Sequence, residues 1–132
     1  MVHMKRLAVL TLLLTTALFL SCGEKENPIN SYYKNIPMIQ GMTRDEKPKV
    51  YNVKVDLGYP QGDKKIQTEL NKRKNQLTDV IRTLLSSLKE EQFLIENQPE
   101  LRQMIKEAVN EVLIEGNVTD VYLLQLQVFE YN

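Results

Sequence analysis

The sequence predicts an α+β domain in which a small antiparallel sheet carries two amphipathic helices on one face, in the order β-α-α-β. Residues 50–59 and 118–131 alternate apolar and polar side chains, which is the period of a half-buried strand. Residues 63–88 repeat apolar side chains at helical spacing, and a second such stripe runs along 101–112. Both helices can bury their apolar stripes if they lie against the same side of the sheet.

The N-terminus has the composition of a secretory signal. Lys5 and Arg6 precede fourteen residues without a charge, 7–20. A helix of that length spans about 21 Å, which is short for a lasting membrane span because the hydrocarbon layer is about 30 Å thick. We therefore expect residues 1–21 to be a signal peptide of the lipoprotein type, with an uncleaved signal anchor as the alternative.

The single cysteine of the chain favours the lipoprotein interpretation. Residues 19–22, Phe-Leu-Ser-Cys, resemble the lipobox of bacterial lipoproteins, in which cleavage precedes the cysteine and the thiol is acylated. Ser21 fits this motif, whereas Phe19 and Leu20 depart from its usual residues. We expect Cys22 to carry the lipid. Both alternatives place the remaining chain outside the cytoplasm, because Lys5 and Arg6 favour the cytoplasmic side.

Residues 22–31 are polar and show neither helical nor strand periodicity, so we expect a flexible tether followed by one domain over 32–132. The domain opens with an aromatic and apolar segment that Pro37 restricts to an edge strand or an extended stretch. The strand at 50–59 comes next and is the clearest one in the chain, with its odd-numbered residues, from Tyr51 to Tyr59, facing the core.

The stripe along 63–88 predicts one long helix that begins at Asp63, a good N-cap residue. Arg73 interrupts the stripe, because it occupies an angle where the spacing requires an apolar residue. We expect Arg73 either to pair with a carboxylate such as Glu69 or Asp79 or to lie in a subunit interface, where arginine is enriched. The remaining apolar positions of the stripe are Ile66, Leu70, Leu77, Val80, Ile81, Leu84 and Leu88.

Past this helix, a short helix or continuation at 89–95 is expected to bury three apolar residues: Phe93, Leu94 and Ile95. The second amphipathic helix is expected to start at Asn97 and to close at Gly116. The final strand is predicted to direct one set of side chains toward the core: Tyr122, Leu124, Leu126 and Val128.

Charge and composition argue against several function classes. The chain has 17 basic and 17 acidic residues, and removal of 1–21 takes away two basic residues, leaving a charge of −2. A chain of this charge has no bulk attraction for nucleic acid. The single histidine, His3, precedes the apolar run, so a processed domain has no histidine for nucleophile activation or transition-metal binding. We therefore expect no catalytic site, no metal and no cofactor.

The lysines of the long helix make it locally basic: Lys64, Lys65, Lys72 and Lys74. A solvated helix face explains such lysines most simply. The functional alternative is a contact with an acidic partner surface, lipid headgroups or the cell wall.

The order of these elements resembles the flagellar basal body-associated protein family FliL over residues 32–131. The likeness includes an aromatic-Pro-apolar segment around Tyr33 and Pro37, and its most specific part includes Arg73 and Asp79. The segments that carry the resemblance are "KVYNVKVDL" at 49–57, "ELNKRKNQLTDVIRTLLSS" at 69–87 and "LRQMIKEAVNEVLIEGNVTDVYLLQLQV" at 101–128.

The resemblance implies a stomatin/prohibitin-like domain and a non-enzymatic role in motility. It also implies a location in the cell envelope, on the periplasmic face of a membrane, with the inner membrane favoured. Such proteins have one N-terminal anchor and a periplasmic domain that lies beside the flagellar stator units, supports torque and tends to form rings. This chain departs from the family by offering a lipobox in place of a transmembrane helix, and by carrying Lys74 and Asn75 where apolar residues and proline are common. The alternative function is therefore an envelope lipoprotein with the same fold that scaffolds a different membrane assembly.

Overall fold

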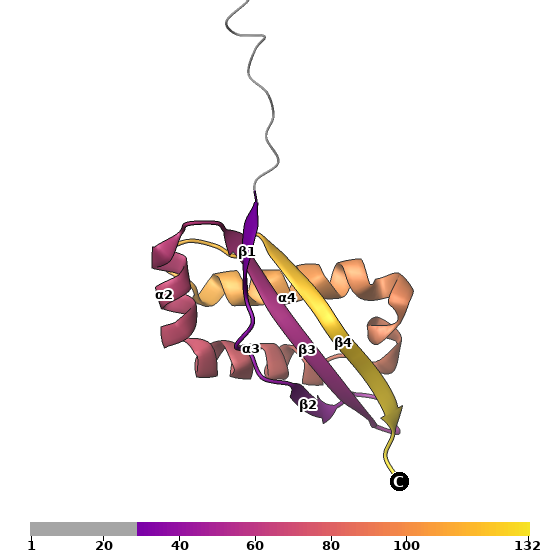
Figure 1. Ribbon diagram of the computed structural model, residues 1–132. Coiled ribbons are helices and arrows are strands. Elements are labelled where there is room, and N and C mark those ends of the chain that lie inside the picture. Colours follow the sequence, from indigo (N-terminus) through magenta and orange to yellow (C-terminus); the bar gives the residue numbers. More distant parts are fainter. Residues whose placement is uncertain (1–28) are drawn as a thin grey trace, which may run out of the picture.

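The computed structural model describes residues 29–132, so the predicted signal peptide, Cys22 and most of the predicted tether lie outside the described residues. The described part is one α+β unit with a small antiparallel sheet and a helical layer (Figure 1). Its elements in chain order are β1 (Asn30–Tyr33), β2 (Ile39–Met42), β3 (Lys49–Pro60), α2 (Lys64–Lys72), α3 (Lys74–Ser86), the 3-10 helices η1 (Glu90–Phe93) and η2 (Ile95–Asn97), α4 (Gln98–Val112) and β4 (Asp120–Glu130).

The sheet is organised around β3, which is central and long. On one side β4 pairs with β3 along almost its whole length, from Lys49↔Glu130 to Gly58↔Asp120. On the other side β1 pairs with one end of β3 and β2 with the other end, so that two short strands share a single edge. The predicted edge segment around Pro37 is thus two short strands with an irregular connection between them.

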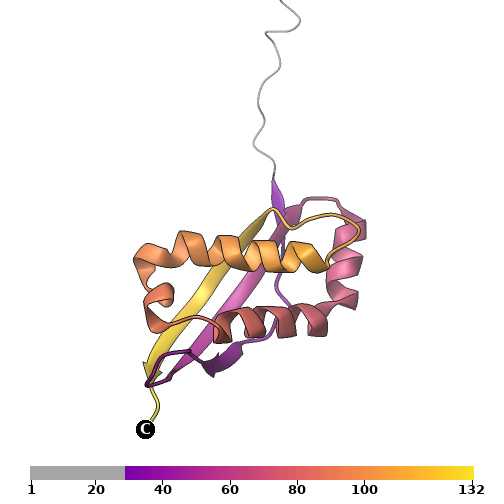
Figure 2. The same cartoon turned by 180° about the vertical axis from the view of Figure 1, so that it is seen from behind.

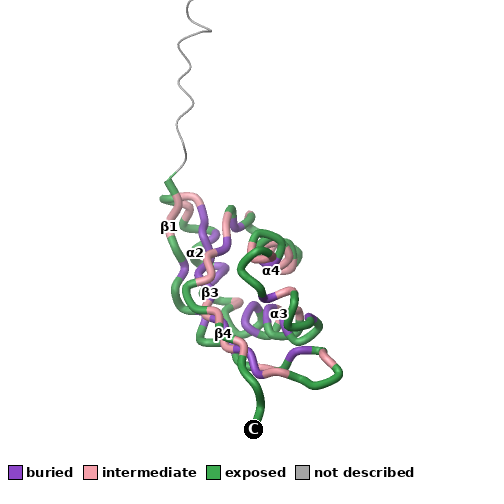
Figure 3. The backbone as a smooth tube through the Cα atoms, turned by 90° about the vertical axis from the view of Figure 1, so that its right-hand side faces the viewer, coloured by how far each residue is buried: buried purple, intermediate pink, exposed green. Residues whose placement is uncertain are grey.

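The helices cover one face of the sheet, as the sequence predicts. Helices α3 and α4 run side by side across one face of the sheet and lie in front of β3 and β4 in the view from behind (Figure 2). The view turned by 90° shows the two layers (Figure 3). The opposite face of the sheet carries no helix among the described elements. The α+β class and the one-sided helical layer are therefore confirmed, whereas the likeness to the stomatin/prohibitin domain stays a prediction.

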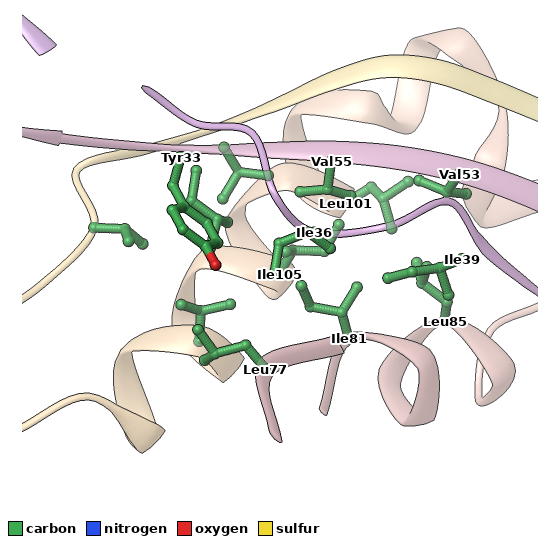
Figure 4. Close-up of a cluster of buried hydrophobic side chains, with 14 of the residues drawn as sticks. Tyr33, Ile36, Ile39, Val53, Val55, Leu77, Ile81, Leu85, Leu101 and Ile105 are labelled. Carbon is green, nitrogen blue, oxygen red and sulfur yellow. The ribbon is translucent and has the colours of Figure 1, made fainter. Parts of the chain in front are cut away.

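The core lies between the two layers (Figure 4). The inward side chains of β3 alternate as predicted, and Tyr51, Val53, Val55 and Leu57 are fully buried. Every residue of the core cluster lies between Tyr33 and Val121. The strand pairs and core contacts of residues 29–132 join all the elements from β1 to β4, so we expect this part of the chain to fold as one unit.

The prediction of a single long helix over residues 63–88 is wrong. The helix divides at Arg73, whose φ of −97° and ψ of 10° depart from helical values, and α2 and α3 point in different directions (Figure 1). The predicted N-cap is confirmed, since the Asp63 carboxylate accepts a hydrogen bond from the N–H of Ile66 at 3.2 Å. The bend lets Ile66 and Leu70 of α2 reach the core, where both are fully buried.

The prediction of which side chains of the last strand face the core is wrong for the first half of that strand. The register between β3 and β4 shifts where Val55 pairs with Leu123 and Lys54 pairs with Gln125, which leaves Leu124 as the extra residue of a β-bulge. A bulge reverses the alternation, so Val121 and Leu123 pack on the core and Leu124 is 62% exposed. After the bulge the prediction holds, because Leu126 and Val128 face the core.

The segment after α3 also differs from its prediction. It forms two 3-10 helices, of which only Phe93 is buried, with its ring stacked on Tyr51 at 5.4 Å between centroids. Leu94 and Ile95 are exposed, so their predicted burial is wrong. Helix α4 follows Asn97 as predicted but ends at Val112, before the predicted stop at Gly116.

Candidate functional site

An open groove lies at the bend between α2 and α3. We call it the basic groove. Its volume of about 840 Å³ lies in the range of ligand pockets, but eight of the nine residues that line it are charged or polar. It is lined by Lys64, Lys65, Thr68, Glu69, Lys72, Arg73, Gln76, Ile114 and Glu115.

The floor of the basic groove is fixed by the carboxylate of Glu69. This side chain is 6% exposed, and it joins α2 to the segment that follows α4. The N–H of Ile114 donates to both carboxylate oxygens at 2.9 and 3.0 Å, and the N–H of Glu115 donates to Oε1 at 2.9 Å. The Nε–H of Arg73 donates to Oε2 at 2.9 Å. One buried carboxylate thus holds together two segments that are 45 residues apart in the chain.

These contacts also set the ionisation of Glu69. Burial by itself raises the pKa of the carboxyl group, but the N–H donors of Glu115 and Ile114 and the Arg73 guanidinium lower it by more. The net result is a pKa below the ordinary value. Glu69 is therefore ionised at neutral pH, and its negative charge is stabilised by hydrogen bonds from Arg73 and from the N–H groups of Ile114 and Glu115.

The structure decides between the two predicted carboxylate partners of Arg73. Its partner is Glu69, not Asp79, and a second hydrogen bond joins its Nη1 to Gln76 Oε1 at 3.0 Å. The arginine side chain is 28% exposed because it stands at the corner of the bend rather than on a straight stripe. No contact of the structure tests its predicted place in a subunit interface.

The lysines of the basic groove are exposed. Lys64, Lys65 and Lys72 form no ion pair with any residue in the part of the chain that the structure describes. Lys64 and Lys65 occupy the first turn of α2, which contains no acidic residue. The amino end of a helix carries partial positive charge, so cations there are unfavourable and an anion is favoured. The groove thus presents positive charge at its rim.

Sequence reasoning identified the basic residues but not the groove. The missing wall comes from Ile114 and Glu115, which nothing local connects to α2. The one local signal was Glu69 itself, a carboxylate next to the apolar position Leu70 and four residues before Arg73, the spacing of a helical ion pair.

A second unpartnered surface is the outer edge of β4. Among the described strands β4 pairs only with β3, so the other side of its backbone is free. The segment 121–129 contains no charged residue and no proline, the residues that commonly protect an edge strand from pairing. Leu124 and Phe129 are exposed along it, and Tyr122 packs edge-on against Tyr32 on the outer face of the sheet.

Two further findings limit the chemistry of residues 29–132. Within these residues no three His, Cys, Asp or Glu side chains come together in a way that could hold a metal ion. No helix in the same range combines the length and the apolar character needed to cross a bilayer. The surfaces described above are suited to binding.

Comparison with known proteins gives one consistent result. A family model described as "Flagellar basal body-associated protein FliL" matches residues 33–128. The flagellar protein FliL of Borreliella burgdorferi is 32% identical over 103 residues, 78% of this chain and 57% of the relative. The flagellar protein FliL of Treponema pallidum is 30% identical over 100 residues, 75% of this chain and 55% of the relative. The chain therefore spans about half the length of the curated relatives that it matches.

Proposed function

The chain belongs to the FliL family of flagellar basal body-associated proteins, and from this membership we propose that it is a membrane-tethered periplasmic accessory protein of the flagellar motor. The observation that carries the proposal is the extent of the family match, because residues 33–128 include all the core residues and both candidate surfaces. FliL is a family of flagellar accessory proteins and not a known family of enzymes. The protein acts by binding.

The proposed partners are the periplasmic parts of the flagellar stator subunits. A domain held beside the stator by its anchor supports torque mechanically, by retaining the stator units under load. The test is a deletion strain that is tracked in media of rising viscosity and on swarm plates. We expect swimming speed to fall more steeply with load than in the parent, with filaments of normal length. Unchanged speed under load would overturn the proposal.

The same experiment distinguishes the second candidate function, an envelope lipoprotein that scaffolds a different assembly. A specific feature that favours this candidate is the lipobox-like segment ending at Cys22, because it departs from the transmembrane anchor implied by the family resemblance. Crosslinking from intact membranes, followed by mass spectrometry, separates the two. Stator subunits among the crosslinked products support the motor role, and envelope proteins without any stator subunit support the alternative.

We propose that acylation of Cys22 supplies the membrane anchor. The measurement is metabolic labelling with an alkyne fatty acid in the wild type and in Cys22→Ala. We expect Cys22→Ala to lose the label and to leave the membrane fraction. Retention of both the label and the membrane location would rule out the lipid and favour the signal anchor.

We propose that the protein self-associates, with a ring as the closed form, and that the free edge of β4 makes one contact of this assembly. A backbone edge of this length without protecting charges is suited to pairing with another strand. Leu124→Lys places a charge on the edge, where the side chain is 62% exposed and therefore little needed for folding. Ile95→Lys is the matched control, because Ile95 is 83% exposed on η2.

We expect crosslinking in membranes to give oligomeric species for the wild type and for Ile95→Lys, and to give none for Leu124→Lys. If the two variants give the same pattern of crosslinked species, the β4 contact is contradicted.

We propose that Arg73 lies at the margin of an assembly contact. A photocrosslinking residue at Gln76, which accepts a hydrogen bond from Arg73 on the groove rim, tests this directly. Failure to capture any protein from that position would remove the proposal for Arg73.

A further inference from the structure

The basic groove begins where the described chain enters the domain. Ile29, the first described residue, accepts a hydrogen bond through its carbonyl from the N–H of Gln61 at 3.1 Å. Asp63 then caps α2, so Lys64 and Lys65 follow within a few residues of this contact. Strand β1 and the amino end of α2 accordingly lie at the same end of the sheet (Figure 1). The groove and the entry point of the tether are neighbours.

The groove is locally basic, although the chain as a whole carries no net charge. Lys64, Lys65 and Lys72 are exposed without ion-pair partners among residues 29–132. Glu69 does not cancel them, because its carboxylate is buried and bound to Arg73 and to two backbone N–H groups. Only Glu115 remains as an acidic residue among the lining side chains. The groove therefore attracts anions locally.

We propose that the basic groove binds the anionic phospholipid headgroups of the membrane to which the chain is anchored. This inference rests on the proposed anchor at Cys22. Seven residue steps separate Cys22 from Ile29, and at most about 3.5 Å per step gives a reach of about 25 Å. The tether therefore keeps Lys64 and Lys65 close to the headgroups, and the contact fixes which side of the domain faces the membrane.

The shape of the groove favours a surface over a small enclosed ligand. The groove is open, and Ile114 is its one apolar lining residue, whereas a pocket that buries most of a small molecule is usually enclosed and lined by several apolar side chains. A second basic hollow exists at the opposite end of β3, lined by Arg44, Arg82, Thr83, Ser86 and Ser87. Helix α3 has 13 residues, so the groove at its start and the hollow at its end are about 20 Å apart at 1.5 Å per residue. The hollow therefore provides an internal control on a separate part of the surface.

The experiment measures binding of residues 29–132 to phosphatidylglycerol vesicles and to phosphatidylcholine vesicles by co-sedimentation. The test variant replaces Lys64, Lys65 and Lys72 with Gln. The control variant replaces Arg44, Lys47 and Arg82 with Gln, which removes the same charge from the far end of the domain. Far-UV circular dichroism confirms that each variant is folded. Because Cys22 is absent from this fragment, the outcome does not depend on the lipid anchor.

We expect the wild type to bind phosphatidylglycerol vesicles and not phosphatidylcholine vesicles. Raising the salt concentration should weaken its binding to the phosphatidylglycerol vesicles. Each lysine near an anionic surface contributes roughly fivefold to the partition coefficient, so the test variant loses roughly 100-fold. The control variant should lose little. Equal losses in the two variants would show a bulk charge effect and overturn the proposal, as would absence of wild-type binding.

Two competing anions, inorganic phosphate and polyglutamate, test whether the groove binds a ligand other than lipid headgroups. If inorganic phosphate at the concentration of the lipid phosphate displaces the protein, the groove binds free anions and the membrane assignment is wrong. If polyglutamate binds more tightly than the vesicles, the groove accepts an acidic protein, which also overturns the assignment. If Cys22→Ala keeps the fatty-acid label while residues 29–132 bind the vesicles, the lipid anchor is wrong and the groove still binds headgroups. If the label is lost but the vesicles are not bound, the headgroup contact is wrong and the anchor stands.

Discussion

Replacement of Glu69 by Gln tests the contact that builds the basic groove. The substitution keeps the shape of the side chain but replaces one acceptor oxygen with an NH₂ donor. In the native structure Oε1 accepts from Ile114 and Glu115, and Oε2 accepts from Arg73 and Ile114. In either orientation the amide directs its NH₂ group at an N–H donor. At least one donor therefore loses its partner.

The size of the effect follows from the burial of this group. A hydrogen bond to a charged group contributes about 1.5–3 kcal/mol, and a donor left without a partner costs about 1–3 kcal/mol. We therefore expect Glu69→Gln to lower the free energy of unfolding by about 2–3 kcal/mol. Urea unfolding of residues 29–132 measures it, and with a slope of about 1–1.5 kcal/mol/M the midpoint falls by about 2 M. Glu111→Gln, an exposed carboxylate on α4, is the control and should change little.

The pH dependence gives an independent check on the same contact. The pKa of Glu69 is lower in the folded protein than its ordinary value, so ionisation of Glu69 stabilises the fold at pH values above the unfolded pKa of about 4.3. That contribution is lost as the pH falls from this value through the folded pKa. The difference between wild type and Glu69→Gln should therefore narrow in acid. A difference below about 0.5 kcal/mol at pH 7, within the range of ordinary surface substitutions, or one that does not narrow, would refute the reasoning.

The other predictions concern the sheet, and unfolding free energies of residues 29–132 measure all three. Gly41→Ala places a Cβ 2.2 Å from the hydroxyl oxygen of buried Tyr51, which costs about 1–3 kcal/mol by overpacking. Lys54→Met leaves the carbonyl oxygens of Lys34 and Ile36, between β1 and β2, without their ammonium donor, and costs about 2 kcal/mol; a neutral result would contradict that role. Tyr33→Phe should be neutral or stabilise by about 1 kcal/mol, because the buried hydroxyl lacks a hydrogen-bond partner among the described residues; a clear loss of stability would show that it has one.

The strand at β3 was predictable because one physical rule acts along its whole length. Every inward side chain from Tyr51 to Tyr59 is buried under the helical layer, so the period of two holds on this face of the strand. On the other face Asp56, which the alternation places toward water, is buried as well. The same rule failed in β4 because a bulge at Leu124 changes which side chains face the core. The segment 121–129 contains no glycine or proline to mark the bulge. The pairing register with β3 determines it, and that information is not local.

The helix break at Arg73 was unpredictable for a related reason. The apolar stripe continues across the break with helical spacing, so periodicity alone indicates one helix. The bend follows from contacts with the segment after α4, where Glu69 binds the N–H groups of Ile114 and Glu115. Gly116 completes this packing, because a Cβ there would lie 2.5 Å from Cδ1 of Ile66. Residue types predicted the positive charge of the site, whereas its concave shape required a partner segment 45 residues away.

The amino end of α2 shows stability and binding acting in opposite directions. Acidic residues in the first turn of a helix stabilise it by about 0.3–1 kcal/mol each, and lysines there have the opposite effect. Lys64 and Lys65 nevertheless occupy this turn without ion-pair partners among the described residues, while Asp63 is used as the N-cap. An anion bound in the groove offsets this cost, because it interacts favourably with the helix terminus and with both lysines. The local cost and the proposed headgroup contact therefore have one physical explanation.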